Sequence, residues 1–283
     1  MSFGSPYLTL PDFSYYKAKT LEEALDILEQ KEGSARILAG GVGIISFMKE
    51  RLVTATDLVD IKGIKELKGV SLESDSVRIG SCTTLQEISE NSLIESKLGA
   101  LYQASRNAAD IAIRNRATVG GNVCEAIPWV DIPVALIALD STINITSKKG
   151  KREMKVESFL KGMFETDLKQ DEIVTHFKVP LHSLRSTFMK FSKGSEFAIA
   201  SVAIGIGDRG SRIVFGSVAE KPVRCREVEE IIDKEGITEH SIRKAMKQAR
   251  ESVECMDDVL ASSEYRKQIV SILTVNALKE VQK

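Results

Sequence analysis

The sequence of 283 residues has few of the residues that build metal sites, disulfide frameworks or membrane spans. Its four cysteines are scattered without a C-x-x-C pair, and its three histidines lack metal-binding spacing. Such sites need close, patterned spacings, so we expect no metal, no iron–sulfur cluster and no disulfide framework in this chain. No apolar run approaches the roughly 18 residues of a transmembrane helix. The first residues have no basic segment followed by an apolar one, so we expect no signal peptide and a cytoplasmic protein.

The chain also lacks an excess of charge of either sign. It has 39 basic and 40 acidic residues, for a net charge of −1. This balance gives no field that would recruit nucleic acid or a membrane surface. Two basic clusters, residues 148–152 and 243–250, are interrupted by acids or follow helical spacing, which is typical of solvated faces. With 43% hydrophobic residues, the composition is that of an ordinary globular protein.

The length favours two or three packed units, because a domain holds roughly 100–200 residues. Patterning predicts a division into residues 1–60, 61–177 and 178–283. The first unit alternates strand and helix, which favours some parallel pairing, and Pro180 marks the second boundary.

The expected helices have amphipathic spacing or begin at a capping residue. Thr20 begins the first, with Glu23 completing a capping box, and Ser262 or Ser263 caps the last, over residues 264–281. The others cover residues 44–51, 85–89, 97–109, 226–234 and 239–253. The expected strands are apolar or β-branched segments: ARIL, TDLVDI, SVRIGSCTT, VALIALD, STINITS, DEIVTHFKVP, EFAIASVAIGI and SRIVFGSV.

Two Gly-Gly pairs are the most informative feature of the chain. Gly40-Gly41 stands in ILAGGVGII, and Gly120-Gly121 stands in ATVGGN, each after a short strand-like run. Glycine lets the backbone take a positive φ and approach a ligand closely. Successive backbone N–H groups in such loops bind phosphate. We therefore predict that the two loops hold one phosphate-bearing ligand from two sides, with a hydroxyl at Thr118 and an amide at Asn122.

A lone acid, Asp131, follows Asn122 by nine residues, and the sequence leaves two roles open for it. It can cap a helix that begins at Ile132-Pro133-Val134, because proline favours the first turn of a helix. It can also be a carboxylate that accepts hydrogen bonds from the ligand.

A third glycine pattern, Gly205, Gly207 and Gly210, has the G-x-G-x-x-G spacing of a dinucleotide-binding loop. That motif has meaning only where it follows a strand and opens a helix. Here a second β-branched run follows, so we predict a β-hairpin with its turn at Asp208-Arg209.

Taken in order, these segments resemble the FAD-binding medium subunit of the molybdenum hydroxylases, the family of carbon monoxide dehydrogenases, xanthine dehydrogenases and aldehyde oxidoreductases. The resemblance covers nearly the whole chain, and RNRATVGGN is its most specific segment. It implies an α+β, vanillyl-alcohol-oxidase-like (PCMH-type) FAD-binding fold. That fold has two α/β subdomains followed by a C-terminal domain of antiparallel strands and a helical bundle.

The resemblance also implies which residues surround a non-covalently bound FAD. The diphosphate and adenosine half would contact Leu38, Ala39, Gly40, Gly41, Val42, Gly43, Ile44 and Ile45. Thr118, Gly120, Gly121 and Asn122 would hold the diphosphate from the other side. Cys124 would line the flavin pocket, and Asp131, Ile173 or Val174, and Lys190 would lie against the cofactor. Gly80 and Thr84 are weaker candidates.

The chain departs from the family pattern in two places. The first loop reads AGGVG, without the polar residue that relatives carry near Val42 or Gly43. Trp129 replaces a small residue just before the acid. Its indole would either cover the flavin and restrict an electron acceptor, or pack in a seam between domains.

The function implied by the resemblance is electron transfer. Substrate oxidation would take place at a molybdenum-pterin centre on a large subunit. Electrons would pass through two [2Fe–2S] clusters on a small subunit to this FAD and then to an external acceptor. The chain offers no general acid or nucleophile of its own. The two alternatives are a self-contained FAD oxidoreductase and a structural subunit without flavin.

Overall fold

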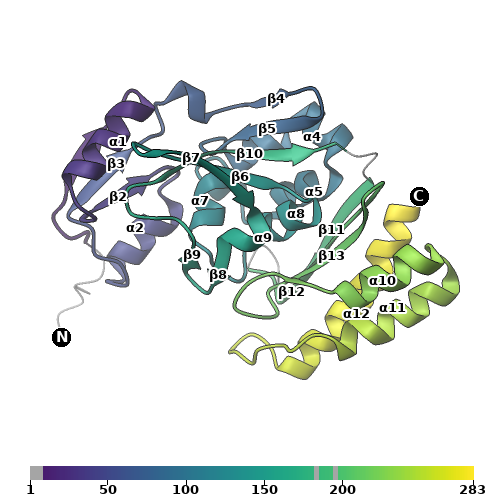
Figure 1. Ribbon diagram of the computed structural model, residues 1–283. Helices are drawn as coiled ribbons and strands as arrows, with labels where there is room; N and C mark the ends of the chain where they lie inside the picture. The colour runs from purple at the N-terminus through teal and green to yellow at the C-terminus, as the bar shows by residue number, and fades with distance from the viewer. Residues whose placement is uncertain (1–8, 182–184, 194–196) are drawn as a thin grey trace, which may run out of the picture.

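The computed structural model describes residues 9–181, 185–193 and 197–283. Figure 1 shows the chain running from a small N-terminal sheet through a central sheet with its helices to a C-terminal sheet covered by helices. The N-terminal sheet is parallel, in the order β1 (Ser14–Lys17), β3 (Asp57–Asp60), β2 (Ala35–Leu38). Two helices belong to it, α1 (Leu21–Gln30) and α2 (Val42–Lys49). This confirms the parallel pairing expected from the alternation of strand and helix.

The first helix begins where its capping residue predicts. The Thr20 hydroxyl accepts a hydrogen bond from the backbone N–H of Glu23 at 3.1 Å. Ala24, Leu25 and Leu28 share one face of α1 and are buried against the sheet. The cap thus sets the register that turns the apolar stripe of the helix inward.

The central sheet has five antiparallel strands. Their order is β4 (Val70–Leu72), β5 (Ser76–Gly80), β10 (Ile173–Pro180), β6 (Thr142–Ser147) and β7 (Gly150–Lys155). The helices of this unit are α3 (Leu85–Ser89), α4 (Ser92–Lys97), α5 (Gly99–Asn107), α6 (Ile111–Arg114), α7 (Val119–Cys124), α8 (Ile132–Ala138) and α9 (Val156–Phe159). A one-turn helix η2 (Lys65–Leu67) and the strand pair β8 (Leu160–Gly162) and β9 (Glu165–Thr166) complete it.

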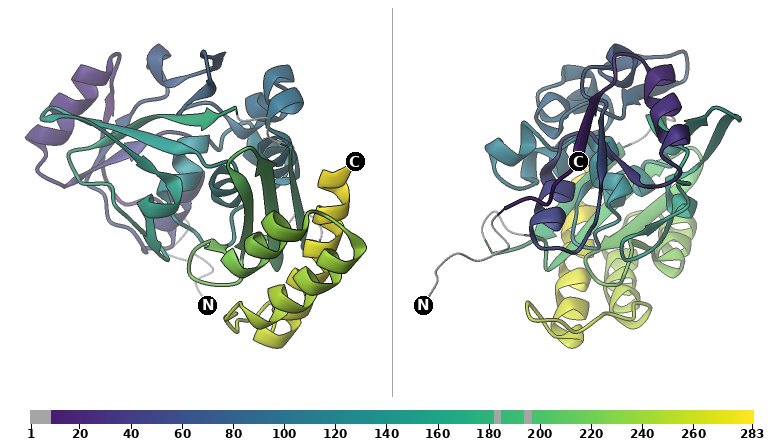
Figure 2. Two further views of the ribbon diagram at one scale, coloured as in Figure 1. Left: turned by 45° about the vertical axis from the view of Figure 1, so that its right-hand side comes forward. Right: turned by 90° about the vertical axis from the view of Figure 1, so that its left-hand side faces the viewer.

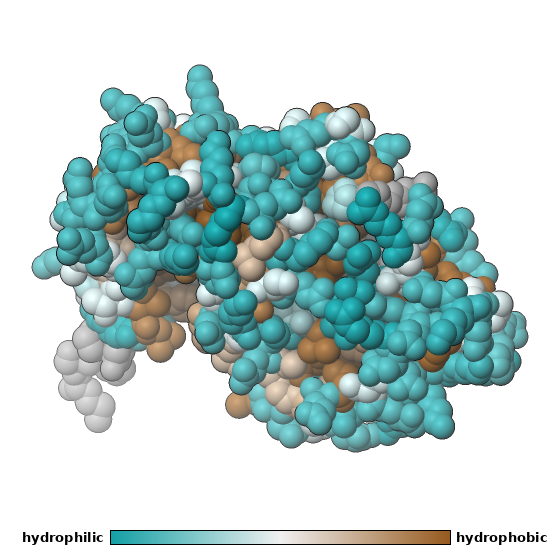
Figure 3. All heavy atoms as spheres, in the orientation of Figure 1, coloured by the Kyte–Doolittle hydropathy of each residue, from teal (hydrophilic) through white to brown (hydrophobic). Residues whose placement is uncertain are grey.

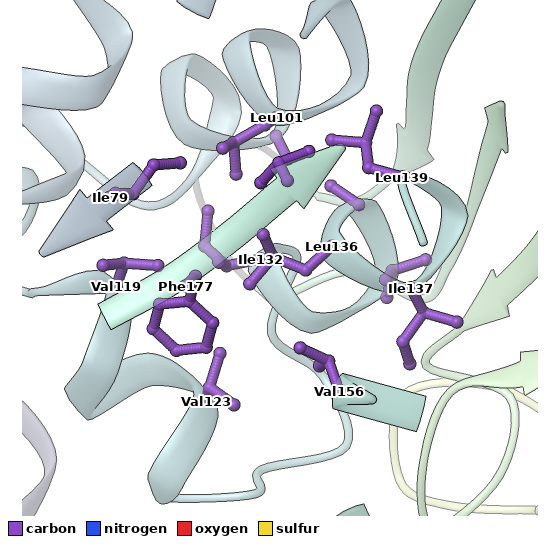
Figure 4. Packing of buried hydrophobic residues seen from close by; sticks show 14 of the residues in the cluster. Ile79, Leu101, Val119, Val123, Ile132, Leu136, Ile137, Leu139, Val156 and Phe177 are labelled. Atoms are coloured by element: carbon purple, nitrogen blue, oxygen red, sulfur yellow. The ribbon is translucent and has the colours of Figure 1, made fainter. Parts of the chain in front are cut away.

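Two expectations for this unit are wrong. The segment VALIALD is not a strand, because residues 132–138 form α8 and all seven are buried. A short apolar run does not distinguish a buried helix from a buried strand, and here Pro133 in the first turn was the better signal. Figure 4 shows why the helix is apolar all round: Ile132 and Leu136 lie among Phe177 of β10 and Val123 of α7. The glycine pair Gly120-Gly121 likewise lies inside a helix, α7, and not after a strand.

The C-terminal unit is a second antiparallel sheet, with its own helices on one face and α8 of the central unit on the other. Its order is β11 (Arg185–Phe191), β12 (Ala200–Gly207), β13 (Gly210–Gly216), β14 (Val223–Arg224). Its helices are α10 (Arg226–Glu235), α11 (Glu239–Glu251) and α12 (Ser263–Gln282), which lie together at the C-terminal end (Figure 2). Alternation along β12 separates two cores: Ala203 packs with α8, whereas Val202 and Ile204 pack with the C-terminal helices.

The β12–β13 hairpin confirms that the G-x-G-x-x-G spacing is not a nucleotide loop. Gly207 pairs with Gly210, whose φ of +90° suits the turn at Asp208-Arg209. Within the described part of the chain, no helix is long and apolar enough to cross a membrane. The face in Figure 3 is mainly hydrophilic, with hydrophobic surface confined to separate patches.

Candidate functional site

The first glycine pair forms the start of α2. Gly41 is the residue before the helix and has a φ of +81°, a left-handed conformation that favours glycine. Gly41 has no side chain to cap this end, so the first N–H groups of α2, at the positive end of the helix dipole, are left to partners from elsewhere in the fold. Gly40 lies against the second loop, because a Cβ there would be 2.1 Å from the carbonyl oxygen of Arg116. The two glycine segments are therefore neighbours in space, as the sequence predicts.

The second glycine pair uses its N–H groups differently from the prediction. The N–H of Gly120 donates to the carbonyl of Ser81 at 2.8 Å, and that of Asn122 donates to the carbonyl of Thr118 at 2.9 Å. The Thr118 hydroxyl accepts from the N–H of Gly121 at 3.1 Å and so caps α7. All three N–H groups thus have partners within the chain. What α7 offers a ligand is its close backbone and the Asn122 side chain, whose Oδ1 is buried without a partner.

Glu125, which the sequence reasoning missed, lies between the two glycine segments. It is the residue after α7, and its carboxylate accepts hydrogen bonds from the backbone N–H groups of Gly43 and Ile44 in the first turn of α2. The approach is close, because a Cβ on Gly43 would be 2.0 Å from Oε1 of Glu125. Burial raises the pKa of this carboxyl to about 7, although the two N–H groups act in the opposite direction. Its position three residues after Asn122, on the same side of a helix, was the available signal.

Asp131 and Lys190 come together from different units of the fold. Lys190 on β11 donates to Oδ2 of Asp131 at 2.8 Å, with side chains 10% and 5% exposed. Asp131 is the N-cap residue of α8, as one of the two alternatives predicts, but its side chain makes no capping hydrogen bond. Its other oxygen, Oδ1, is buried without a partner. Burial raises the pKa of Asp131 to about 6, and the charge of Lys190 offsets part of that effect.

The remaining predicted residues divide between the loop and the core. Ile173 and Val174 on β10 are buried in two different cores, the N-terminal and the central one. Cys124 ends α7, and burial raises the pKa of its thiol to about 12. In the first loop, Leu38 ends β2 and is buried, and Ala39 packs on the N-terminal core. Val42 begins α2, while Ile44 and Ile45 pack beside Leu38.

The structure gives Gly80 and Thr84 other roles. A Cβ on Gly80 would be 2.4 Å from the carbonyl oxygen of Leu67, so close packing of the backbone explains the glycine. Thr84 caps α3 in a capping box with Glu87. Thr84 also pairs with Thr118 through a β-bridge, which holds the turn after β5 against the start of α7.

Trp129 lies two residues before Asp131 in the chain. Its ring centroid is 6.2 Å from that of Phe197, a side chain that is 55% exposed. The indole Nε1 is buried and has no hydrogen-bond partner. The two roles predicted for Trp129 both remain predictions: the contact joins the second unit to the third, and it stands beside the Asp131 segment.

A polar pocket of about 140 Å³ lies elsewhere, lined by residues such as Arg78, Asn144 and His176. It shares no residue with the predicted set, so it does not mark the same site. Among residues 9–181, 185–193 and 197–283, no group of three or more His, Cys, Asp or Glu side chains could hold a metal ion.

A glycine-lined helix start, a second glycine helix against it and buried polar side chains beyond it define a nucleotide-binding flavoprotein of the PCMH type. Residues 11–182 match the FAD binding domain in molybdopterin dehydrogenase, and residues 187–281 match the CO dehydrogenase flavoprotein C-terminal domain. The chain belongs to the FAD-binding medium subunits of the molybdenum hydroxylase family.

The matches to individual relatives extend over nearly the full length of both chains. The chain is 34% identical to the glyceraldehyde dehydrogenase medium chain of Sulfolobus acidocaldarius, over 96% of this chain and 99% of the relative. It is 28% identical to the xanthine dehydrogenase FAD-binding subunit of Escherichia coli O157:H7, over 94% and 95%. The structure of a Cu,Mo-CO dehydrogenase in its cyanide-inactivated form superposes with a TM-score of 0.92 at 25% identity, over 97% of this chain and 99% of that chain. The predicted family and fold are confirmed.

The residues present fit FAD with one exception. The α2 N-terminus suits the negative diphosphate, and the free oxygens of Asn122 and Asp131 suit hydroxyl or N–H donors of the cofactor. Glu125 does not fit as an ionised group, because it brings a second negative charge to the same N–H groups.

Proposed function

We propose that this chain binds one FAD non-covalently between residues 38–45 and α7 and serves as the electron-transfer subunit of a molybdenum hydroxylase. The observation that carries the proposal is the N-terminus of α2, which has no cap from its own N-cap residue and is packed at Gly40 against the backbone that leads into α7. That arrangement gives a dianionic diphosphate backbone donors on one side and a close, side-chain-free wall on the other. It also explains why glycines stand at both places.

The other residues proposed to contact FAD lie on α7, at the start of α8, and on β10 and β11. Asn122, Cys124 and Asp131 would lie along the cofactor, with Lys190 holding Asp131 in place. Ile173 and Val174 would contribute backbone and apolar surface from β10. Gly80 and Thr84 stay weaker candidates, since packing and capping account for them.

The chemistry of the proposed subunit is electron exchange, which bound FAD supplies. The chain's own residues bind the cofactor, keep water from it and orient it; we assign no general acid, base or nucleophile. The proposed partners are a small subunit with two [2Fe–2S] clusters and a large subunit with a molybdenum-pterin centre. The names of the relatives, a medium chain and an FAD-binding subunit, support this division. An external acceptor would take the electrons.

The proposal keeps the three units, residues 1–60, 61–177 and 178–283, as its domain division. Support comes from the three larger sheets, one in each unit, although β10 extends to Pro180. A cytoplasmic location is also proposed, which four free cysteines support.

The test is the flavin content of the purified complex. We expect about one FAD per copy of this chain, released into the supernatant by acid precipitation because no covalent bond holds it. A colourless complex that cannot be reconstituted with FAD would contradict the proposal and favour the structural subunit without flavin. Steady turnover by the isolated chain would favour the self-contained oxidoreductase.

A further inference from the structure

The Glu125 carboxylate occupies the donors that a diphosphate would use. Its oxygens accept from the N–H groups of Gly43 and Ile44, the first-turn donors that α2 presents at its positive end. α2 has eight residues, enough for the dipole to contribute at its terminus. A carboxylate and a diphosphate oxygen are both acceptors, so they compete for the same two N–H groups.

Glu125 cannot move far from this site. Its backbone N–H donates to the carbonyl of Gly121 at 3.0 Å, which fixes its Cα to the end of α7. Asn122, whose Oδ1 is buried and unpaired, lies one turn earlier on the same helix. The Glu125 Cα therefore stays beside the space between α7 and α2, whether or not its carboxylate keeps the α2 donors.

An ionised Glu125 would then face a ligand with two negative charges. Like charges at close range within a protein disfavour each other's ionised form. Protonation removes the conflict, since a neutral carboxyl can also donate a hydrogen bond to a phosphate oxygen.

We propose that the Glu125 carboxylate occupies the diphosphate position in the FAD-free chain, where it holds the two glycine segments together. When FAD binds, the Glu125 carboxylate takes up a proton. The inference rests on the proposed function, because it assumes that the diphosphate binds at the start of α2. Above about pH 7, where Asp131 with its pKa of about 6 is already ionised, it makes FAD affinity depend on pH through the Glu125 carboxyl.

Charged and titratable residues also stand on the elements around Glu125. Lys49 is at the far end of α2, Arg116 contributes its backbone to the Gly40 contact, and Glu165 lies on β9. Cys124 on α7 is the neighbour whose thiol pKa Glu125 helps to raise. The pKa of Glu125 itself is set by burial against the two N–H groups.

The sign of the pH dependence follows from proton linkage. Glu125 already has a pKa of about 7 in the FAD-free chain. The negative diphosphate raises it further, so the complex holds a proton that the free chain has lost. FAD affinity therefore falls as pH rises above about 7, by up to about tenfold per pH unit, and Glu125 adds no slope well below that pH. The diphosphate of FAD is fully ionised throughout this range and adds no titration.

The experiment is calorimetric titration of the FAD-depleted protein with FAD, in two buffers of different ionisation enthalpy. At about pH 8 we expect the wild-type chain to take up close to one proton per FAD bound. Glu125→Gln keeps the size and the hydrogen-bond acceptor, so it should take up almost none and bind FAD with an affinity that is flat above about pH 7. Glu254→Gln, an exposed carboxylate on the loop after α11, is the matched control and should behave as wild type.

The outcomes separate this inference from the proposed function. If wild type and Glu125→Gln show the same proton uptake and the same slope, Glu125 does not titrate with binding and the inference fails while FAD binding stands. If Glu125→Gln binds FAD more weakly at every pH, Glu125 is a favourable contact and the inference also fails. If no variant binds FAD at any pH, the proposed function itself fails. The wild-type uptake measurement needs no variant, so it remains decisive if Glu125→Gln is unstable.

Discussion

Lys190 and Asp131 are 59 positions apart in the chain, yet Nζ of one lies 2.8 Å from Oδ2 of the other in a buried setting. The pair joins β11 of the third unit to the start of α8 in the second. One oxygen of Asp131 is left without a partner, which is a costly arrangement in the interior unless a ligand donor completes it. The ion pair therefore links the stability of the boundary between the two units to the proposed cofactor site.

Replacing Asp131 tests whether the ion pair with Lys190 stabilises the boundary between the two units. Asp131→Ala leaves the Lys190 ammonium buried and unpaired, so we expect the free energy of unfolding to fall by about 3 kcal/mol. Asp131→Asn keeps an acceptor for Lys190 and should lose less. Urea unfolding of the FAD-free protein gives both values. Equal losses for the two variants would show that the ion pair is not what stabilises this boundary.

The two adjacent glycines of α7 should separate folding from cofactor binding. A Cβ on Gly120 would be 2.7 Å from the carbonyl oxygen of Ser81, so Gly120→Ala should lower the free energy of unfolding by about 1–3 kcal/mol through overpacking. At Gly121 the only atom of the described residues within 4 Å of an added Cβ, the neighbouring backbone aside, is the Thr118 hydroxyl, at 3.1 Å, and we expect the side chain to enter the space proposed for the ligand. Gly121→Val should therefore lose FAD while remaining folded. Flavin content and thermal unfolding distinguish the two effects, and a Gly121→Val protein that keeps its FAD would contradict the loop assignment.

The contacts of Asp57 lead us to expect that the stability of the N-terminal sheet falls in acid. Its carboxylate pairs with Lys31 at 2.8 Å and accepts from the hydroxyls of Thr56 at 2.7 Å and Ser34 at 3.1 Å. The Lys31 contact, followed by that of Thr56, lowers the pKa of Asp57 to about 2. A lowered folded-state pKa adds stability above the unfolded value, and that stability is lost as pH falls from about 4 to about 2.

The measurement for Asp57 is a comparison of wild type with Asp57→Asn across that pH range. The variant should be less stable near neutral pH, and the difference should shrink toward about pH 2, where the wild-type carboxylate is protonated. A difference that stays constant with pH would assign the effect to packing.

Arg266 should be one of the most costly positions to change outside the site. Its side chain is fully buried on α12, where it donates to the carbonyls of Ile199 and Ser217 and pairs with Asp258 at 2.5 Å. Arg266→Met removes these donors together, so we expect a loss of about 3 kcal/mol or more in urea unfolding. Arg243→Met, with a side chain that is 70% exposed, is the control and should change stability by less than about 0.5 kcal/mol. Similar losses at both positions would refute the role of Arg266.

Local signals predicted much of the fold, and long-range contacts account for what was missed. Thr20 and Ser262 cap their helices as expected, because a cap is set by residues within one turn. The strand predicted at α8 failed because burial on every side removes the periodicity that separates helix from strand.

The candidate site shows the same division. The sequence predicted that the two glycine segments lie together, and the contact between Gly40 and the backbone before α7 agrees with that prediction. That the α7 N–H groups are already bonded depends on Ser81, in a turn far back in the sequence. Glu125 was missed because its role comes from Gly43, on another helix. Its spacing from Asn122 places it on the ligand side of α7, but no spacing within either segment shows that it reaches α2.

The internal hydrogen bonds of α7 have a consequence for how the protein matures. The backbone N–H groups at the start of α7 donate to Thr118, to Ser81 and within the helix, and those of Gly43 and Ile44 in α2 donate to Glu125. These N–H groups therefore have hydrogen-bond partners without a ligand. Synthesis of the chain and supply of the cofactor are then separate events. A cell short of flavin would accumulate folded, empty subunits that can be loaded later, in place of misfolded chains destined for degradation.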